Sequence, residues 1–118
     1  MKTEIVYFDN IQKEIIFYIG KNDSDNFTII DMASPNDMWF HANDYSSCHV
    51  VAKMDNTEDL SKKELHSIYK KGAFLCKENT NKLKKLSNVE FIYTFKKNIT
   101  KTDKTGCVIT KDTKKIIC

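Results

Sequence analysis

The chain has 118 residues, the length of one domain with a single hydrophobic core. Hydrophobic residues make up 41% and charged residues 30%, as in a folded domain with a well-solvated surface. The formal net charge of +3 is too small to indicate a polyanionic partner by itself. The start, MKTEIVYF, has no apolar run that predicts a signal peptide or a membrane span. We therefore expect one domain over residues 1–118.

All nineteen basic residues are lysine. Lysine is a mobile point charge, whereas bidentate contacts to phosphates and bases favour arginine. A nucleic acid would therefore be bound through its backbone, with strong salt dependence. The four cysteines contain no CxxC pair. Without a secretion signal they predict free thiols in a reducing, intracellular (cytoplasmic) protein.

The first half of the chain predicts two hairpins and a short helix. The first hairpin surrounds the polar DNIQK, and the second surrounds NDYSS. Between them, Asp23 or Ser24 is expected to cap a helix whose inward side chains are Phe27, Ile30 and Met32. Ser34-Pro35-Asn36-Asp37 then ends that helix. The expected strands are residues 4–8, 14–19, 38–42 and 48–54.

The second half predicts the main helix and three more strands. Ser61 and Glu64 form a capping box, and an apolar stripe at helical spacing follows. That stripe contains Leu65, Ile68, Tyr69, Gly72, Leu75 and Cys76. Residues 89–95 form a strand, KKNITKTDKTG is an exposed basic connection, and residues 107–110 and 114–118 form a closing hairpin. We therefore expect an α+β domain, in which antiparallel hairpins form a sheet packed against the main helix, with one short helix besides.

The second hairpin gathers rare residues on one face. Strand alternation separates Trp39 and His41 from the core positions beside them. If NDYSS is a tight connection, His49 lies across the hairpin from His41, and Lys53 shares its face. The pattern therefore predicts a patch of an indole, two imidazoles and an ammonium group.

Three functions fit this patch, besides a structural role in which the histidines only satisfy backbone groups. A metal site would use the histidines with Asp44 or Cys48, but no third ligand has motif spacing. A general base would act on Ser46 or Ser47, but no nucleophile elbow accompanies them. The remaining function is binding of a polyanion, with Trp39 for stacking and imidazole and lysine donors for phosphate. We expect no catalytic residue, metal or cofactor.

The distribution of lysine favours the polyanion. Acidic residues fall mainly before Glu64, and basic residues dominate after Lys70. Such runs are usually only solvated faces, but lysines interspersed with Asn and Thr are also what a groove along a phosphate backbone needs. The loop contributes Lys96, Lys97, Lys101 and Lys104.

These motifs resemble the RNA-binding (R) domain of the NFACT proteins, over nearly the whole chain. In that family a glycine–basic–asparagine turn precedes a D-[IL]-W-[FL]-H strand, and an S-x-H-V strand follows; IGKND, DMWFH and SSCHVV are the equivalents here. VEFIYT, the lysine loop, TGCVIT and KKIIC also fit, and the chain looks most like the short stand-alone members. The motif falls on Gly20, Lys21, Asn22, Asp37, Trp39, His41, Ser47, His49 and Val50.

The resemblance implies a non-enzymatic domain that binds RNA, either tRNA or rRNA, in translation or ribosome-associated quality control. Lys21 replaces the arginine usual in long NFACT proteins, and the glycine before their S-H-V step is absent near Ser46. Alternatives are a protein-interaction module on a ribosomal or RNA-processing partner, a DNA-binding domain, and a metal-dependent nuclease. The expected nucleic-acid contacts are Lys21, Asn22, Trp39, His41, His49, Lys53, Lys96, Lys97, Lys101 and Lys104.

Overall fold

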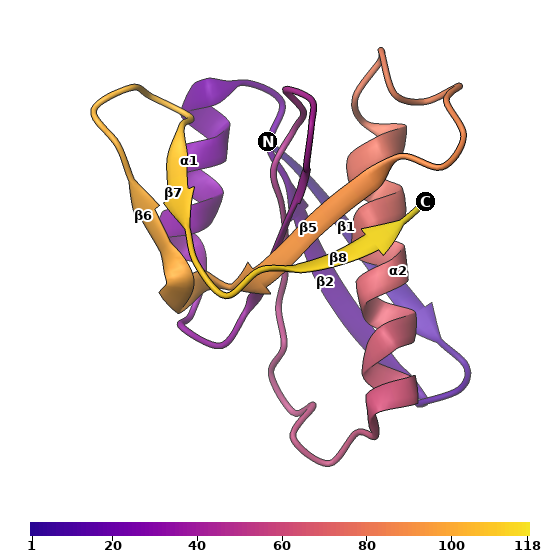
Figure 1. Ribbon diagram of the computed structural model, residues 1–118. Coiled ribbons are helices and arrows are strands. Elements are labelled where there is room, and N and C mark those ends of the chain that lie inside the picture. Colours follow the sequence, from indigo (N-terminus) through magenta and orange to yellow (C-terminus); the bar gives the residue numbers. More distant parts are fainter.

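Alternating apolar side chains build a central antiparallel sheet with both faces covered. The computed structural model describes all 118 residues. Six strands pair in the order β1-β2-β4-β3-β5-β8. Helix α2 packs on one face, and helix α1 with the small β6–β7 sheet packs on the other (Figure 1). The elements are β1 Lys2–Phe8, β2 Lys13–Ile19, α1 Asp23–Met32, β3 Met38–Ala42, β4 Val50–Ala52, α2 Lys62–Glu78, β5 Glu90–Phe95, the 3-10 turn η1 Lys96–Asn98, β6 Ile99–Lys101, β7 Val108–Thr110 and β8 Lys114–Ile117.

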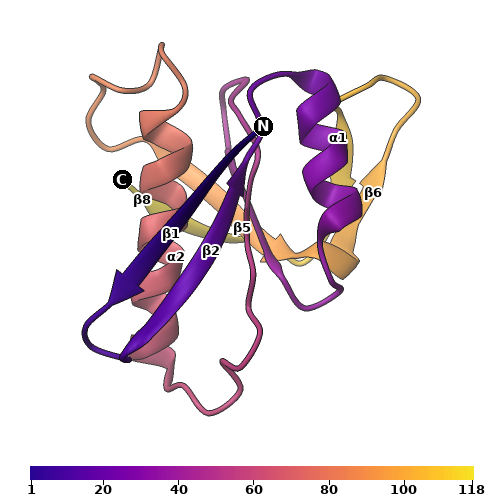
Figure 2. The same ribbon diagram turned by 180° about the vertical axis from the view of Figure 1, so that it is seen from behind.

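The expected α+β class and both early hairpins are confirmed. Strand β1 pairs with β2, and β3 pairs with β4, each antiparallel. Figure 2 shows the β1–β2 hairpin from the side on which it extends past α1. None of the helices has the length and apolar character that a membrane span requires.

The alternation predicted for β3 separates two cores. Met38, Phe40 and Ala42 belong to the larger core beneath α2. Trp39 belongs to a smaller core with Ile29, Ile30, Ala33 and Val51, beneath α1. Because both faces of the sheet are covered here, the face that carries Trp39 is interior as well.

Helix α2 begins as predicted and meets the sheet at its glycine. The Ser61 hydroxyl accepts from the Glu64 N–H, and the Glu64 carboxylate accepts from the Ser61 N–H. At Gly72 the helix approaches the sheet so closely that an added Cβ would overlap the Phe40 ring. Glycine is therefore required here for packing, although it lowers helix propensity.

Two details of α1 differ from the expectation. The N-cap is Asn22, whose side chain accepts from the Asp25 N–H. The buried residues are Asn26, Ile29 and Ile30, whereas Met32 is 42% exposed. Spacings of three and four residues put Asn26, Ile29 and Ile30 on one helix face, from which Met32 is rotated away.

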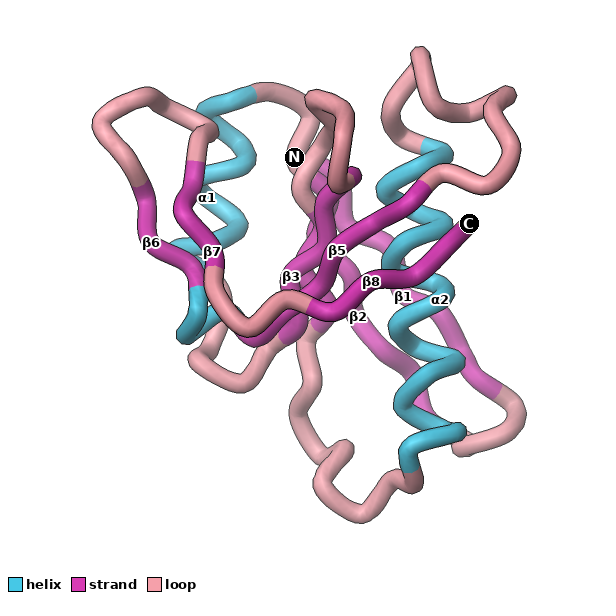
Figure 3. Tube along the Cα trace, viewed as in Figure 1, coloured by secondary structure: helices cyan, strands magenta, loops and turns pink.

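The predicted closing hairpin is wrong. Strand β7 pairs with β6, and β8 pairs with the central strand β5 (Figure 3). The basic connection is thus partly ordered as η1 and β6, because Ile99 and Val108 pack against the smaller core. Paired backbone hydrogen bonds between Val89 and Cys118, of 3.0 and 2.9 Å, fix the end of β8 to β5.

We predict that Gly72→Ala lowers the free energy of unfolding by about 1–3 kcal/mol, because the added methyl overpacks the Phe40 ring. Urea unfolding measures this value. Lys70→Ala, at an exposed position of the same helix, is the matched control and should change it by less than about 0.5 kcal/mol. Helix propensity alone would make Gly72→Ala at least as stable as wild type, and that result would contradict the close packing.

Candidate functional site

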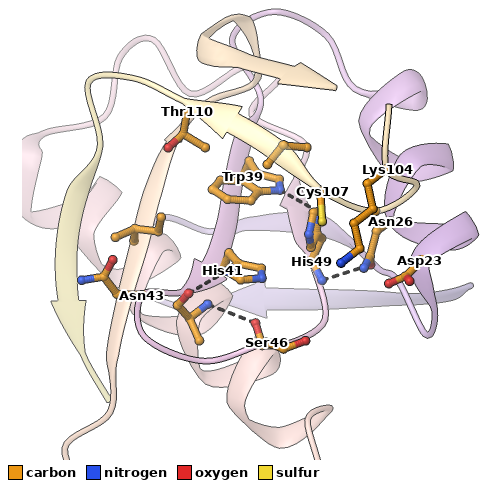
Figure 4. Close-up of a pocket in the computed structure, with 15 residues that line it drawn as sticks. Asp23, Asn26, Trp39, His41, Asn43, Ser46, His49, Lys104, Cys107 and Thr110 are labelled. Carbon is orange, nitrogen blue, oxygen red and sulfur yellow. Dashed lines mark hydrogen bonds between the residues drawn. The ribbon is translucent and has the colours of Figure 1, made fainter. Parts of the chain in front are cut away.

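Two loops and the start of α1 meet at one end of the molecule, at the top of Figure 1. They enclose a cleft of about 440 Å³. Its walls come from α1, from the connection between β3 and β4, and from the β6–β7 hairpin (Figure 4). The lining includes Asp23, Asn26, Trp39, His41, Asn43, Ser46, Ser47, His49, Ile92, Lys104, Gly106, Cys107, Val108 and Thr110.

His49 is fixed at three points. Its Nδ1 accepts a hydrogen bond of 3.1 Å from the indole Nε1–H of Trp39. Its backbone N–H donates to Asn26 Oδ1 at 3.1 Å, and its carbonyl accepts from the Gly20 N–H at 3.0 Å. A Cβ at Gly20 would overlap the Asn26 amide. The glycine of the GKN turn is therefore needed for the contact that anchors His49.

His41 lies beside this anchored ring. Its Nδ1 donates to the carbonyl of Ala42 at 2.6 Å. The Trp39 and His41 rings are stacked, 5.6 Å apart between centroids and 3° from parallel, and the His41 and His49 rings are edge to face at 4.9 Å. Trp39 itself is 2% exposed. It positions both imidazoles and has no face left for stacking on a base.

Burial makes both imidazoles neutral near pH 7. Loss of solvent and, to a smaller extent, the nearby His41 together lower the pKa of His49 to about 3. Burial also lowers the pKa of His41, although the hydrogen bond to Ala42 opposes the shift. Neither imidazole therefore brings a positive charge to a phosphate, although the N–H of a neutral ring can still donate a hydrogen bond.

A second cleft, of about 430 Å³, continues the first. The two clefts share Asp23, Asn26, Ser46 and Ser47, and together we call them the groove. The second cleft adds Lys21, Asn22, Cys48, Asn79, Thr80, Asn81 and Lys82.

The charge along the groove is mainly positive. Lys21, Lys82 and Lys104 line it, and none of them is in an ion pair. Asp23 is the only carboxylate in its walls. An anionic ligand would therefore meet three free ammonium groups and one opposing charge.

The structure does not join all the predicted contact residues in one patch. Lys53 lies at the other end of the β3–β4 pair, where its Nζ contacts the buried Asp37 carboxylate at 2.5 Å. Lys96 is at that end too, because its N–H donates to the Asp37 carbonyl, and Lys97 follows it. Lys101 pairs with Asp31 at 2.6 Å. Lys21, Asn22, His41, His49 and Lys104 are the predicted residues that do meet.

The metal-site interpretation lacks a ligand set, since no three His, Cys, Asp or Glu side chains are grouped closely enough to hold an ion. The four cysteines are free. Cys48 and Cys76 lie 3.9 Å apart between sulfur atoms, where burial raises the pKa of Cys76.

Several groove residues were missed at the sequence level. Asn26 is the most important, and its signal was a polar residue on the same helix face as Ile29 and Ile30. Gly106, with φ of +86°, brings the β6–β7 loop against Asp23. A Cβ added at this glycine would lie only 2.8 Å from the Asp23 side chain. No sequence pattern pairs Lys82 with Lys21, because α2 brings Lys82 to the groove only in the folded chain.

Comparisons with known proteins give relatives over most of the chain. A family model described as the NFACT protein RNA binding domain matches residues 4–114. A coiled-coil domain-containing protein 25 homolog from Dictyostelium discoideum is 33% identical over 98 residues, 83% of this chain and 47% of that protein. Coiled-coil domain-containing protein 25 from Bos taurus is 34% identical over 88 residues, 72% of this chain and 40% of that protein.

A solved structure has the same fold. The C-terminal part of the fibronectin/fibrinogen-binding protein from Streptococcus suis superposes with a TM-score of 0.76 and 27% identity, over 99% of this chain and 45% of that one. The chain thus spans less than half the length of the relatives it matches.

We predict that stability falls as the pH is lowered from about 6.5 toward 5. In the unfolded chain His49 binds a proton near its ordinary pKa of 6.5, whereas in the folded chain it stays neutral until about pH 3. Each histidine held neutral in this way therefore lowers the free energy of unfolding by up to about 1.4 kcal/mol per pH unit as the pH falls below 6.5. Urea unfolding at pH 7, 6 and 5 measures the slope.

His49→Asn keeps an acceptor for the Trp39 indole but does not titrate, so its stability should change less between pH 7 and 5. His66→Asn, at an exposed position on α2, is the control and should keep the wild-type slope. Equal slopes for wild type and His49→Asn would mean that His49 is not held neutral.

Proposed function

Because the chain belongs to the family of the NFACT protein RNA binding domain, we propose that it binds RNA through the lysine-lined groove. That membership agrees with the resemblance indicated by the GKN turn and the tryptophan–histidine hairpin. One observation supports the groove most: its three free lysines border two adjoining clefts that share four lining residues. Free ammonium groups on both sides of a hollow attract a phosphate backbone without reading its sequence.

The biological setting follows from the family rather than from the groove. We propose a structured RNA, tRNA or rRNA, as the partner, in translation or ribosome-associated quality control, and inside the cell. The free thiols suit a reducing compartment. The domain acts by binding rather than catalysis. DNA is an alternative, because a backbone-binding surface separates the two nucleic acids only where it contacts the 2′-hydroxyl.

An exposed apolar patch favours a second function, docking on a protein. Ile5 and Tyr7 of β1 are 59% and 56% exposed, and Ile16 faces Ile5 across the hairpin. Large apolar side chains grouped on a surface commonly mark a protein interface. The patch lies on the hairpin that extends past α1 (Figure 2), away from the groove.

We predict that Lys21→Glu, Lys82→Glu and Lys104→Glu together weaken binding to tRNA at least tenfold at about 100 mM salt, and by a similar factor for unrelated RNA sequences. Three lost phosphate contacts should also make the slope of log K against log salt shallower by about 2. Filter binding between about 50 and 200 mM salt measures both quantities.

The matched control replaces Lys62, Lys63 and Lys70 of α2 with glutamate, which gives the same change in net charge. These three lysines are exposed and lie outside the groove. It should lose less than threefold. A third variant, Lys96→Glu, Lys97→Glu and Lys101→Glu, tests the loop. If the loop variant loses more than the groove variant, the site is at the other end of the molecule; a wild-type salt slope near zero would contradict backbone binding.

We predict that Ile5→Lys with Tyr7→Lys abolishes any capture of a ribosomal or RNA-processing partner that survives nuclease and high salt, while tRNA affinity stays within threefold. The pair removes apolar area from an interface and adds charge. Ser87→Lys with Thr113→Lys, exposed outside both the patch and the groove, adds the same charge and is the control. Capture unaffected by the first variant would exclude this patch as the docking surface.

A further inference from the structure

We propose that the groove binds one unpaired nucleotide, with its base against His41 and His49 and its phosphate between Lys21 and Lys82. This inference rests on the RNA-binding function proposed above and names the part of the RNA that enters. The groove would then bind the phosphate backbone without regard to sequence and would also hold one base that is not paired in an RNA helix.

The hydrogen bonds give the two imidazoles opposite tautomers. The Trp39 indole can only donate, so His49 Nδ1 is unprotonated and its proton is on Nε2. The Ala42 carbonyl can only accept, so His41 Nδ1 carries the proton and its Nε2 is a bare acceptor. The pair therefore combines one N–H donor with one nitrogen acceptor.

Neither Nε2 atom is sealed from solvent. No buried side-chain nitrogen or oxygen lacks a hydrogen-bond partner, and no intramolecular hydrogen bond includes either Nε2. Both atoms are therefore solvent-accessible, in residues that line the cleft. A neighbouring donor and acceptor match the Watson–Crick edge of an unpaired base, which also carries a donor beside an acceptor.

Charge separates the two halves of the groove. The half with the histidines holds two neutral rings, one lysine, Lys104, and the Asp23 carboxylate, which also lines the other half (Figure 4). The other half adds Lys21 and Lys82 and no further carboxylate. A phosphate is therefore favoured at the lysine end, whereas polar but uncharged groups, such as a base and its ribose, are favoured at the histidine end.

The size and walls of the groove suit this ligand. Each half falls within the range of small-molecule sites, about 300–1,000 Å³. Ile92 and Val108 supply apolar wall in the histidine half. Trp39, buried beneath them, keeps both imidazoles in place, so little side-chain entropy is lost on binding.

Long-range ¹H–¹⁵N NMR of the imidazoles tests the base position directly. AMP and UMP should shift the Nε2 signals of His41 and His49 saturably, whereas ribose 5-phosphate and inorganic phosphate should shift only the amides near Lys21 and Lys82. If AMP and UMP saturate those amides while both Nε2 signals stay unchanged, the base does not enter the cleft and the inference is wrong.

Oligonucleotide binding separates this inference from the function on which it rests. Wild type should bind a single-stranded RNA at least fivefold more tightly than an abasic chain of the same length. His41→Gln should bring that ratio close to one, and exposed His66→Gln should preserve it. A wild-type ratio of one overturns the nucleotide pocket but leaves backbone binding in place. Absence of binding to either chain overturns RNA binding itself, and the mononucleotide titration still decides whether the cleft accepts a base.

Discussion

The hydrogen bond from the buried Trp39 indole to His49 links the smaller core to the groove. An indole N–H sealed beneath α1 needs an acceptor, because leaving it unpaired costs about 1–3 kcal/mol. His49 provides that acceptor only while its ring is neutral, so the packing that requires the bond also keeps the imidazole uncharged. The same packing that stabilises the fold therefore determines that the groove contains an uncharged imidazole. Asn26 and Gly20 hold the His49 ring in place.

The two ends of the β3–β4 pair handle charge in opposite ways. At one end Asp37 is buried, accepts from the N–H groups of Ser34 and Met54, and is balanced by Lys53. A buried carboxylate without a cation would be strongly destabilising, so Lys53 is needed to stabilise the fold. At the other end no carboxylate is buried, and Lys21 and Lys104 stay free. Lys53 is thus unavailable to a partner, whereas Lys21 and Lys104 can offer their positive charge.

Local patterns in the sequence predicted much of the fold, including the hairpins, the α2 capping box and the alternation along β3. They failed where a contact depends on distant segments. Alternation shows which face Trp39 occupies, but only α1 and β6–β7, packing from elsewhere, make that face interior. The ion pair between Asp37 and Lys53 depends on the fold of the turn before Asp37, and no residue spacing in the sequence predicts it. The β6–β7 pairing was missed because a lysine-rich sequence conceals two strands anchored only by Ile99 and Val108.

A chain without arginine has limited means of selecting an RNA. Lysine ammonium groups attract phosphates from any sequence, and salt screens them, so they supply affinity and little discrimination. Discrimination requires groups that cost free energy when left unpaired against the wrong partner, and uncharged donors and acceptors in a partly dry cleft have that property. The imidazoles of His41 and His49 are groups of this kind, and their hydrogen bonds to Ala42 and Trp39 hold them in place. Under the proposed function, the free lysines would supply the attraction and the neutral rings the selection, in two parts of one groove.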